Sequence, residues 1–196
     1  MAYQDDIKKA AALLLPWNKL SGCNILVTGA TGLIGGCLVD VLMAHKGRNY
    51  NVYASGRNEE RAGRRFLKYA DDNSFHFVKY DVAHPLEYDV NFQYIIHAAS
   101  GAYPEEFIKH PVEVIKGNIN GVDNLMGYGI QHGIKRLLYI SSGEVYGEGD
   151  GRVFTENYSG YVDCTSLRSC YPSSKRAAET LCISYGAEYG IDVVIA

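Results

Sequence analysis

Short apolar runs, each bounded by turn-forming residues, recur along the chain. Such runs are typical of buried strands, whereas apolar residues spaced three and four apart predict helices. The predicted strands are Asn24–Thr28, Asn51–Ser55, Phe75–Tyr80, Tyr94–Ala98, Arg136–Ser141 and Asp192–Ala196. The predicted helices are Leu33–His45, Pro111–His132 and Tyr171–Tyr189.

This alternation of strands with helices predicts an α/β fold. Strand–helix–strand units form parallel sheets, and near-continuous apolar strands are expected where helices cover both faces. We therefore expect a doubly wound parallel sheet over residues 21–196, preceded by a helical N-terminal extension over residues 1–20. Residues 147–170, rich in Gly, Ser, Asp and Tyr, predict a long loop, and a loop of this length is commonly functional or disordered.

The composition excludes several classes of protein. The net charge of −3 and the absence of a basic run argue against binding to nucleic acid or to an anionic membrane. No apolar stretch reaches the roughly 18 residues of a membrane span, and the N-terminus lacks a signal-peptide pattern, so we expect a cytoplasmic protein. The five cysteines include no C-x-x-C pair, which predicts reduced, mostly buried thiols, no disulfide framework and no metal site.

A glycine-rich turn joins the first predicted strand to the first predicted helix. Gly29, Gly32 and Gly35 have the spacing G-x-x-G-x-x-G, in the strand–turn–helix context that a dinucleotide-binding turn requires. The start of the helix offers free N–H groups to phosphates. We expect NAD or NADP to contact this turn through Gly29, Thr31, Gly32, Leu33, Ile34 and Gly35.

The end of the second strand selects between the two dinucleotides. An acidic residue there favours NAD, and a basic residue accommodates the 2′-phosphate of NADP. The strand ends in Ser55-Gly56-Arg57-Asn58, with no acid at its tip. Arg57 is either a phosphate-binding guanidinium or a solvated loop residue, so the choice between NAD and NADP stays open.

A tyrosine and a lysine supply candidate acid–base chemistry. Tyr171 and Lys175 are four residues apart and share one face of a helix, whose first turn Pro172 favours. An ammonium close to a phenol favours the phenolate, which makes Tyr171 a candidate general base for a hydroxyl group. Ser142, at the end of the fifth strand, would hydrogen-bond the same oxygen.

Together, these motifs resemble the extended short-chain dehydrogenase/reductases, the NAD-dependent epimerase/dehydratase family of nucleotide-sugar enzymes. The resemblance runs from about Gly22 to Ala196 and follows the family's order. The matching segments are Gly29-Ala30-Thr31-Gly32-Leu33-Ile34-Gly35, Asp81-Val82, His97-Ala98-Ala99-Ser100, Asn118, Ser141-Ser142-Gly143-Glu144-Val145-Tyr146-Gly147 and Tyr171-Pro172-Ser173-Ser174-Lys175.

The resemblance implies further roles. Asp81 and Val82 would border the adenine, although Asp81 taken alone is better explained as a turn-forming residue after a strand. Ala98, Ala99, Ser100 and Ser141 would line the cofactor, Asn118 would fix the geometry of the active site, and Tyr171 and Lys175 would also contact the cofactor. Tyr171 would be the acid/base, Lys175 would favour its phenolate and contact the ribose, and Ser142 would orient the substrate. His97 is expected to be a core histidine.

The segment Ser142-Gly143-Glu144 bears on the reaction class. In sugar-nucleotide 4,6-dehydratases this segment reads Thr-Asp-Glu, and in UDP-glucuronate decarboxylases Thr-Ser-Glu. Glu144 is therefore either catalytic or a loop carboxylate. Two segments, 104–111 and 168–182, resemble the decarboxylases. The favoured function is therefore a decarboxylase-like enzyme that acts on a UDP- or dTDP-linked sugar. The alternatives are a 4-epimerase, a 4,6-dehydratase and a non-catalytic NAD(P)-binding regulator.

Two expectations concern the whole protein. In the family, strand six continues into a C-terminal region that binds the sugar nucleotide, and we expect that region to be missing here. The two long helices, around 107–132 and 171–190, form a paired interface in dimeric relatives. A homodimer through this face is therefore predicted, with apolar contributions from Ile115, Ile119, Leu181 and Ile183.

Overall fold

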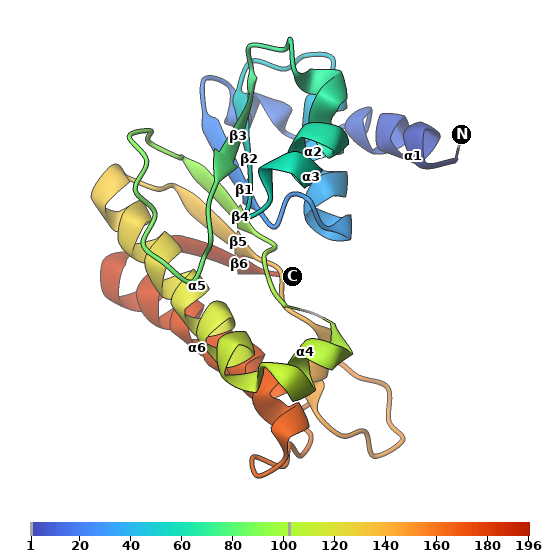
Figure 1. Cartoon of the computed structure of the whole chain (residues 1–196), viewed down its shortest axis with the longest axis vertical. Coiled ribbons are helices and arrows are strands. Elements are labelled where there is room, and N and C mark those ends of the chain that lie inside the picture. Colours follow the sequence, from blue (N-terminus) through green and yellow to red (C-terminus); the bar gives the residue numbers. More distant parts are fainter. Residues whose placement is uncertain (1, 102) are drawn as a thin grey trace.

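The computed structural model describes residues 2–101 and 103–196 and contains one parallel sheet covered by helices on both faces (Figure 1). The strands occur in the order β3-β2-β1-β4-β5-β6, and every neighbouring pair is parallel. Their bounds are β1 Asn24–Thr28, β2 Asn51–Gly56, β3 Phe75–Lys79, β4 Tyr94–His97, β5 Arg136–Tyr139 and β6 Asp192–Ile195. The order reverses between β1 and β4, where ligands bind in open α/β sheets.

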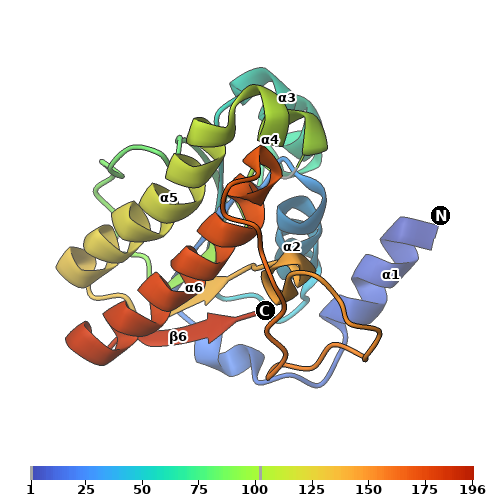
Figure 2. The same ribbon diagram turned by 90° about the horizontal axis from the view of Figure 1, so that it is seen from below.

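The helices divide between the two faces. Figure 2 shows α5 and α6 side by side along one face, and α2 and α3 cover the other. The α-helices are α1 Ala2–Ala11, α2 Leu33–Ala44, α3 Glu59–Phe66, α4 Pro104–Lys109, α5 Pro111–His132 and α6 Cys170–Tyr189. Four 3₁₀ turns connect them: η1 Trp17–Leu20, η2 Leu67–Tyr69, η3 Gly143–Tyr146 and η4 Leu167–Ser169.

The alternation of side chains along β1 produces two hydrophobic cores. Ile25 and Val27 point to the α2/α3 side, where they join Val39 and Phe66, whereas Leu26 joins the cluster under α5 and α6. Successive strand residues face opposite sides of a sheet, so a strand covered on both faces must be apolar throughout. All three of these β1 residues are at most 1% exposed.

The structure confirms the parallel sheet, its six strands and the three long helices, with ends that move by one or two residues. The N-terminal helix is shorter than predicted, because α1 ends at Ala11 and a non-helical segment containing Pro16 follows. Helices α3 and α4 were not predicted, although Asn58 caps α3 by accepting a hydrogen bond from the Arg61 amide. Residues 147–166 form a long loop, as predicted. The loop ends at residue 166 instead of residue 170, because η4 begins at Leu167 and α6 at Cys170.

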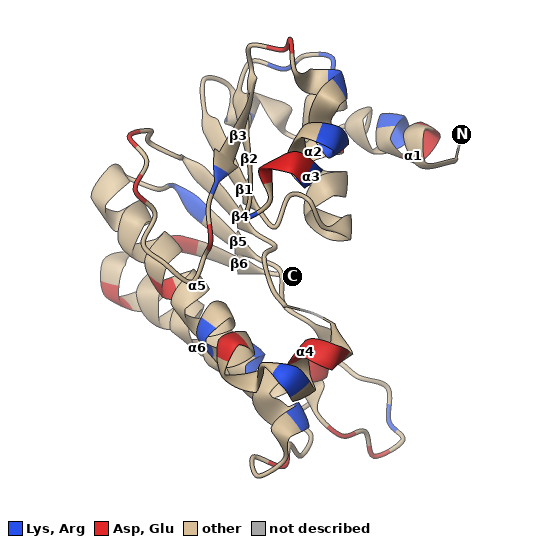
Figure 3. Cartoon of the chain, in the orientation of Figure 1, with Lys and Arg blue, Asp and Glu red and all other residues tan. Residues whose placement is uncertain are grey.

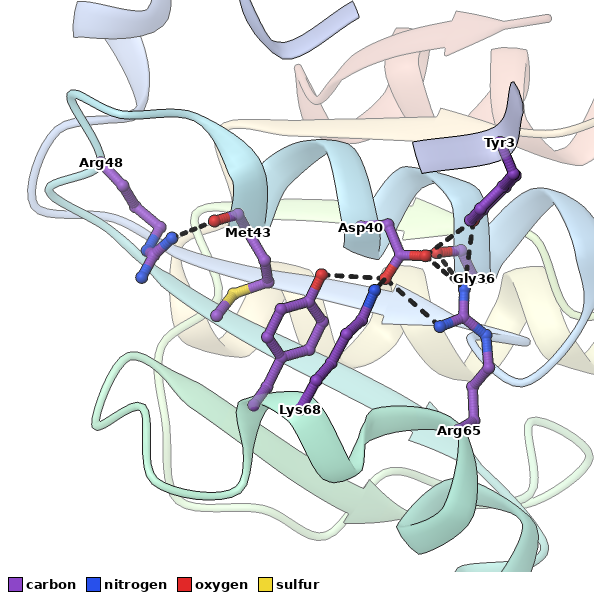
Figure 4. A network of polar contacts seen from close by, with 8 residues as sticks. Tyr3, Gly36, Asp40, Met43, Arg48, Arg65 and Lys68 are labelled. Atoms are coloured by element: carbon purple, nitrogen blue, oxygen red, sulfur yellow. Dashed lines mark hydrogen bonds and ion pairs between the residues drawn. The ribbon is translucent and has the colours of Figure 1, made fainter. Parts of the chain in front are cut away.

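A buried carboxylate fastens α1 to α2 (Figure 4). Asp40 on α2 is fully buried and accepts hydrogen bonds from Tyr3 of α1 at 2.7 Å, from Arg65 at 2.6 Å and from Tyr69 at 2.9 Å. Lys68 Nζ lies 2.9 Å from the same carboxylate. Each carboxylate oxygen therefore has at least two partners, as a buried charge requires.

The surface agrees with the composition. Lys and Arg residues and Asp and Glu residues are both spread over the helices, strands and loops (Figure 3). Within residues 2–101 and 103–196, no helix is long and apolar enough to cross a membrane. The five cysteines are free thiols, of which Cys23, Cys170 and Cys182 are buried and Cys164 is exposed.

Candidate active site

The turn between β1 and α2 brings the backbone very close to the end of β4. Gly29 has φ +65°, and a Cβ atom there would lie 2.6 Å from the Ala98 carbonyl oxygen. A Cβ at Gly35 would lie 2.5 Å from the Gly29 carbonyl oxygen, so no larger residue fits between the helix and the turn. The close approach of backbone atoms therefore requires glycine at the first and third positions of the motif.

The start of α2 carries uncapped amides. Its N-cap is Gly32, which supplies no side-chain hydrogen bond. The first amides of a helix have no intrahelical acceptor, so those of Leu33 and Ile34 are available to an external acceptor. Both side chains are exposed, at 86% and 53%. A glycine-rich turn that leads to free amides at the switch point of the sheet suits a pyrophosphate.

The ends of β2 and β3 enclose a polar hollow beside this turn. Arg57 has an 80% exposed side chain, and its Nη1 lies 3.9 Å from Asp81 Oδ2. Asp81 Oδ1 accepts a 3.1 Å hydrogen bond from the Ala83 amide, so Asp81 forms a turn as well as facing Arg57. The hollow is lined by Thr31, Arg57, Asn58, Glu59, Glu60, Arg61 and Lys79. It lies where the adenosine end of a dinucleotide would extend from the turn.

A chain of hydrogen bonds connects the end of β4 with α6. The Ala99 amide donates to Thr28 Oγ1 at 3.3 Å, and Ser100 Oγ donates to Asn118 Oδ1 at 2.8 Å. Asn118, only 1% exposed, donates in turn to Ser174 Oγ at 2.9 Å. The predicted residues Ala98, Ala99, Ser100 and Asn118 thus lie together between the glycine turn and α6. Val82 lies beside them, where its carbonyl accepts from Asn124 at 2.9 Å.

His97 is a core residue, as predicted. It is 1% exposed, and its Nδ1 lies 2.8 Å from Thr28 Oγ1. Burial, reinforced by the nearby Lys175 ammonium, lowers the pKa of His97 to about 3, so the ring is neutral at physiological pH. Its Nε2 has no hydrogen-bond partner among the described residues, and the absence of a side chain at Gly121 leaves room for the ring.

Tyr171 and Lys175 lie one turn apart at the start of α6, and both are almost completely buried. Lys175 Nζ donates a 2.9 Å hydrogen bond to the Ile140 carbonyl and lies 5.9 Å from the centre of the Tyr171 ring. Burial lowers the pKa of Lys175 to about 8, and the charge of Glu179 opposes this effect. The lysine is therefore mainly an ammonium at neutral pH.

A stacked set of side chains joins Tyr171 to Glu144. The Phe107 ring of α4 stacks on Tyr171 with centroids 4.6 Å apart, and the Arg168 guanidinium lies 4.6 Å above Phe107. Arg168 also forms a short ion pair with Glu144. Arg168 begins the segment 168–182, whose resemblance to the decarboxylases predicted no contact for this residue. Residues this far apart in sequence give no local sign of such stacking.

The strand-five segment forms the next wall of the site. Ser142 begins η3, and its Oγ accepts a 3.3 Å hydrogen bond from the Glu144 amide. Ser141 Oγ donates to Glu179 Oε1 at 2.5 Å, a contact that the sequence did not indicate. The predicted cofactor contact of Ser141 remains a prediction, as do the catalytic roles of Ser142 and Glu144.

The loop after η3 is closed at its base by a clasp between residues 146–148 and 160–161. The Gly160 amide donates to the Tyr146 carbonyl at 2.8 Å, and the Glu148 amide donates to the Tyr161 carbonyl at 2.9 Å. Arg176 of α6 binds the clasp through a 2.9 Å hydrogen bond to the Gly160 carbonyl. The base of the loop is thus fixed to the helix that carries Tyr171.

The chain is similar to one protein family and to several curated proteins. Residues 25–196 match the model of the NAD dependent epimerase/dehydratase family. UDP-glucuronic acid decarboxylase 6 from Arabidopsis thaliana is 36% identical over 179 residues, which cover 90% of this chain and 50% of that protein. UDP-glucuronic acid decarboxylase 1 from Danio rerio is 33% identical over 174 residues, covering 88% of this chain and 40% of the relative. The chain spans about half the length or less of these relatives.

Solved structures show the same fold. The UDP-glucose 4-epimerase of Thermotoga maritima, solved with UDP-glucose, superimposes with a TM-score of 0.69 at 25% identity, covering 88% of this chain and 54% of that one. The dTDP-glucose 4,6-dehydratase of Bacillus anthracis, in complex with NAD, gives a TM-score of 0.71 at 22% identity over 89% of this chain and 54% of that one.

Proposed function

Because this chain belongs to the NAD-dependent epimerase/dehydratase family, we propose that it forms the dinucleotide-binding part of an enzyme that oxidises a nucleotide sugar at C4. The observation that carries this proposal is the buried Tyr171–Lys175 pair beside the glycine turn. Lys175 is only 2% exposed, and burying its charged ammonium costs free energy. Buried titratable groups of this kind are concentrated at functional sites, which favours a catalytic role for the pair.

The cofactor of this proposal is NAD or NADP, which would supply the hydride acceptor when bound. Leu33 and Ile34 would hold the pyrophosphate through their amides, beside the turn that Gly29, Thr31, Gly32 and Gly35 form. Asp81 and Val82 would lie at the adenine. Ala98, Ala99, Ser100, Asn118 and Ser141 would lie along the ribose and nicotinamide side. The NAD-bound structural neighbours support this assignment, and Arg57 leaves NADP as the second candidate.

The chain's own residues would carry the proton. Tyr171 would take the proton of the C4 hydroxyl while the C4 hydrogen leaves as hydride, which forms the C4 carbonyl. The Lys175 ammonium would stabilise the negative charge that develops on the tyrosine oxygen during this transfer, and Ser142 would hydrogen-bond the reacting oxygen. Burial of the pair strengthens their electrostatic interaction relative to that in water.

Within this class, a decarboxylase-like reaction is favoured. The dehydratase acid is replaced by Gly143, which has no proton to give to a leaving hydroxyl. Oxidation of a glucuronate at C4 gives a β-keto acid, which loses carbon dioxide without such an acid. The curated relatives described above are decarboxylases, which supports this choice. A 4-epimerase, which needs only Tyr171, Lys175 and Ser142, is the second candidate.

The substrate would be a UDP- or dTDP-linked sugar, as in the relatives and neighbours. We propose a homodimer for the intact protein, because Ile115 and Ile183 leave apolar side chains exposed on α5 and α6. A cytoplasmic location is proposed as well, which the free thiols favour.

The test is turnover by the whole protein that carries this chain, supplied with NAD and UDP-glucuronate. We expect carbon dioxide release and a UDP-pentose, and Tyr171→Phe should reduce the rate by about 10²–10⁴ with cofactor binding retained. Tyr161→Phe, at a 64% exposed tyrosine of the loop, serves as the matched control. Inversion at C4 without carbon loss would identify an epimerase, and a 4-keto-6-deoxy product from UDP- or dTDP-glucose a dehydratase. Dinucleotide binding with no turnover would identify the regulator.

A further inference from the structure

The carboxylate of Glu179 lies one helical turn beyond Lys175 on α6 and has no part in the proton transfer described above. Its Oε1 accepts the 2.5 Å hydrogen bond from Ser141 Oγ. Lys175 Nζ donates to the carbonyl of Ile140, the preceding residue. Two side chains one turn apart on α6 therefore hold two consecutive residues at the end of β5.

Several titratable groups surround the Lys175 ammonium. They are His97 from β4, Tyr139 from β5 and Tyr171, Glu179 and Cys182 from α6. Burial lowers the pKa of His97 to about 3, raises that of Cys182 to about 12 and raises that of Tyr139 as well, so these three groups are neutral at pH 7. Glu179 is the acidic side chain of this set.

Glu179 affects Lys175 through its charge and without a direct contact. Among the described residues no ion pair within 4.0 Å joins Lys175 to Glu179, and the carboxylate instead accepts the hydrogen bond from Ser141. In a partly buried setting, opposite charges interact over longer distances than they do in water. Glu179 can therefore stabilise the ammonium without competing for its hydrogen bonds or drawing it away from Tyr171.

We propose that Glu179 is a positioning residue of the active site, whose Ser141-held carboxylate keeps Lys175 an ammonium beneath Tyr171 and fixes the strand end that precedes Ser142. The catalytic meaning of this inference rests on the proposed function. The effect of Glu179 on Lys175 does not, since it can be measured without any turnover.

The direct test follows the ¹³Cε chemical shift of Lys175 with pH in the lysine-labelled chain. The unaltered chain should titrate near 8, the pKa that burial gives this lysine. Glu179→Gln keeps the shape and the hydrogen-bond acceptor but removes the charge, so the midpoint should fall by about half a pH unit or more. Glu188→Gln, at an exposed acid of the same helix, is the matched control and should leave the midpoint unchanged.

An unchanged midpoint in Glu179→Gln, or an equal fall in Glu188→Gln, would overturn the proposal. If Glu179→Gln does not fold, Glu179→Asp decides the matter, because it keeps the charge and should hold the midpoint near that of the unaltered chain. If the midpoint of Glu179→Asp falls by about half a pH unit, although the charge is kept, the charge of Glu179 is not the cause.

A second measurement is the pH profile of turnover in the whole protein. Loss of the Lys175 proton should define the alkaline limb, and Glu179→Gln should move that limb to lower pH, with about a twofold loss of kcat at pH 8. A merely structural role would lower kcat equally at all pH values, which would contradict the proposal. Absence of turnover in the unaltered protein would contradict the proposed function and leave the titration of Lys175 to decide this inference.

Discussion

Among single residues, Asp40 shows how much one buried carboxylate can hold together. Burial by itself would raise its pKa, but hydrogen bonds from Arg65, Tyr3, Lys68 and Tyr69 outweigh this effect and lower the pKa to about 2. Replacement by Asn would leave two cations without their partner. Asp40→Asn should therefore lower the free energy of unfolding at pH 7 by about 3–5 kcal/mol, measured by urea denaturation.

The pH dependence of this effect has a definite sign. A carboxylate whose pKa is lowered on folding stabilises the protein above its unfolded pKa and loses that contribution as pH falls toward the folded value. The difference between the unaltered chain and Asp40→Asn should therefore shrink between about pH 4 and pH 2. Asp89→Asn, at an exposed position, should change stability by less than about 0.5 kcal/mol throughout. A difference that persists undiminished at pH 2 would show that charge is not the cause.

Arg57 decides a question that the sequence left open. If its exposed guanidinium binds a 2′-phosphate, Arg57→Ala should weaken NADP about tenfold and leave NAD almost unchanged, as measured by calorimetry. Arg64→Ala, at an exposed arginine of α3 paired with Glu60, provides the control. Equal losses for both dinucleotides, or no loss for either, would assign Arg57 to the solvated loop.

The residue scale also shows what the sequence could not predict. The glycines, Tyr171 and Lys175 have local spacing that reveals their role, because a turn and a helical face are set by neighbours in the chain. The partners Glu144–Arg168, Ser141–Glu179 and Tyr3–Asp40 are 24, 38 and 37 residues apart and meet only after the sheet forms. No periodicity in the chain marks such pairs.

For the elements, the turn between β1 and α2 offers a prediction with an internal control. Gly29 and Gly133 share a positive φ, at +65° and +69°, but only Gly29 faces backbone atoms at close range. Gly133→Ala should cost about 1–2 kcal/mol of stability from backbone strain. Gly29→Ala should cost about 1–3 kcal/mol more and abolish dinucleotide binding, because β4 must move away from β1. Similar losses in thermal and chemical denaturation for the two variants would contradict this account.

Long elements were predictable and short ones were not. Strands buried on both faces and helices such as α5 carry enough apolar periodicity to be recognised, and only their ends differ from expectation. Helices α3 and α4 are eight and six residues long, too short for a reliable period. The sequence signals for α3 are instead its N-cap Asn58, the acidic Glu59 in its first turn and the basic Arg65 in its last turn.

At the scale of the whole molecule, the apolar residues on α5 and α6 predict a homodimer. Ile115 and Ile183 are 38% and 58% exposed, whereas Leu181 packs into the core and so is not expected to contribute. Ile115→Glu with Ile183→Glu should convert the dimer to a monomer in light scattering of the whole protein. Leu14→Glu removes a fully exposed leucine on the N-terminal segment and should leave the mass unchanged. A monomer in the unaltered protein, or a dimer in the double variant, would reject this face.

The order of the strands followed from general rules. Crossovers between parallel strands are right-handed as a rule. The chain first builds outward from β1 to β3 and then returns to the other side of β1 to build from β4 to β6, which gives the order β3-β2-β1-β4-β5-β6. The position of the site at the β1–β4 reversal was therefore predictable. The depth at which Lys175 is buried was not, since it depends on how α6 packs on β5.

The clasp at the base of the loop has a consequence for sequence length. Because paired hydrogen bonds join residues 146–148 to residues 160–161, the chain between them begins and ends at one fixed point beside α6. Lengthening a closed loop costs little free energy, roughly 0.6 kcal/mol for each doubling. Extra residues inserted between 150 and 157 would therefore leave Tyr171 undisturbed. This stretch is where the protein can acquire new surface, a peptide tag or an added recognition segment, at the edge of the site.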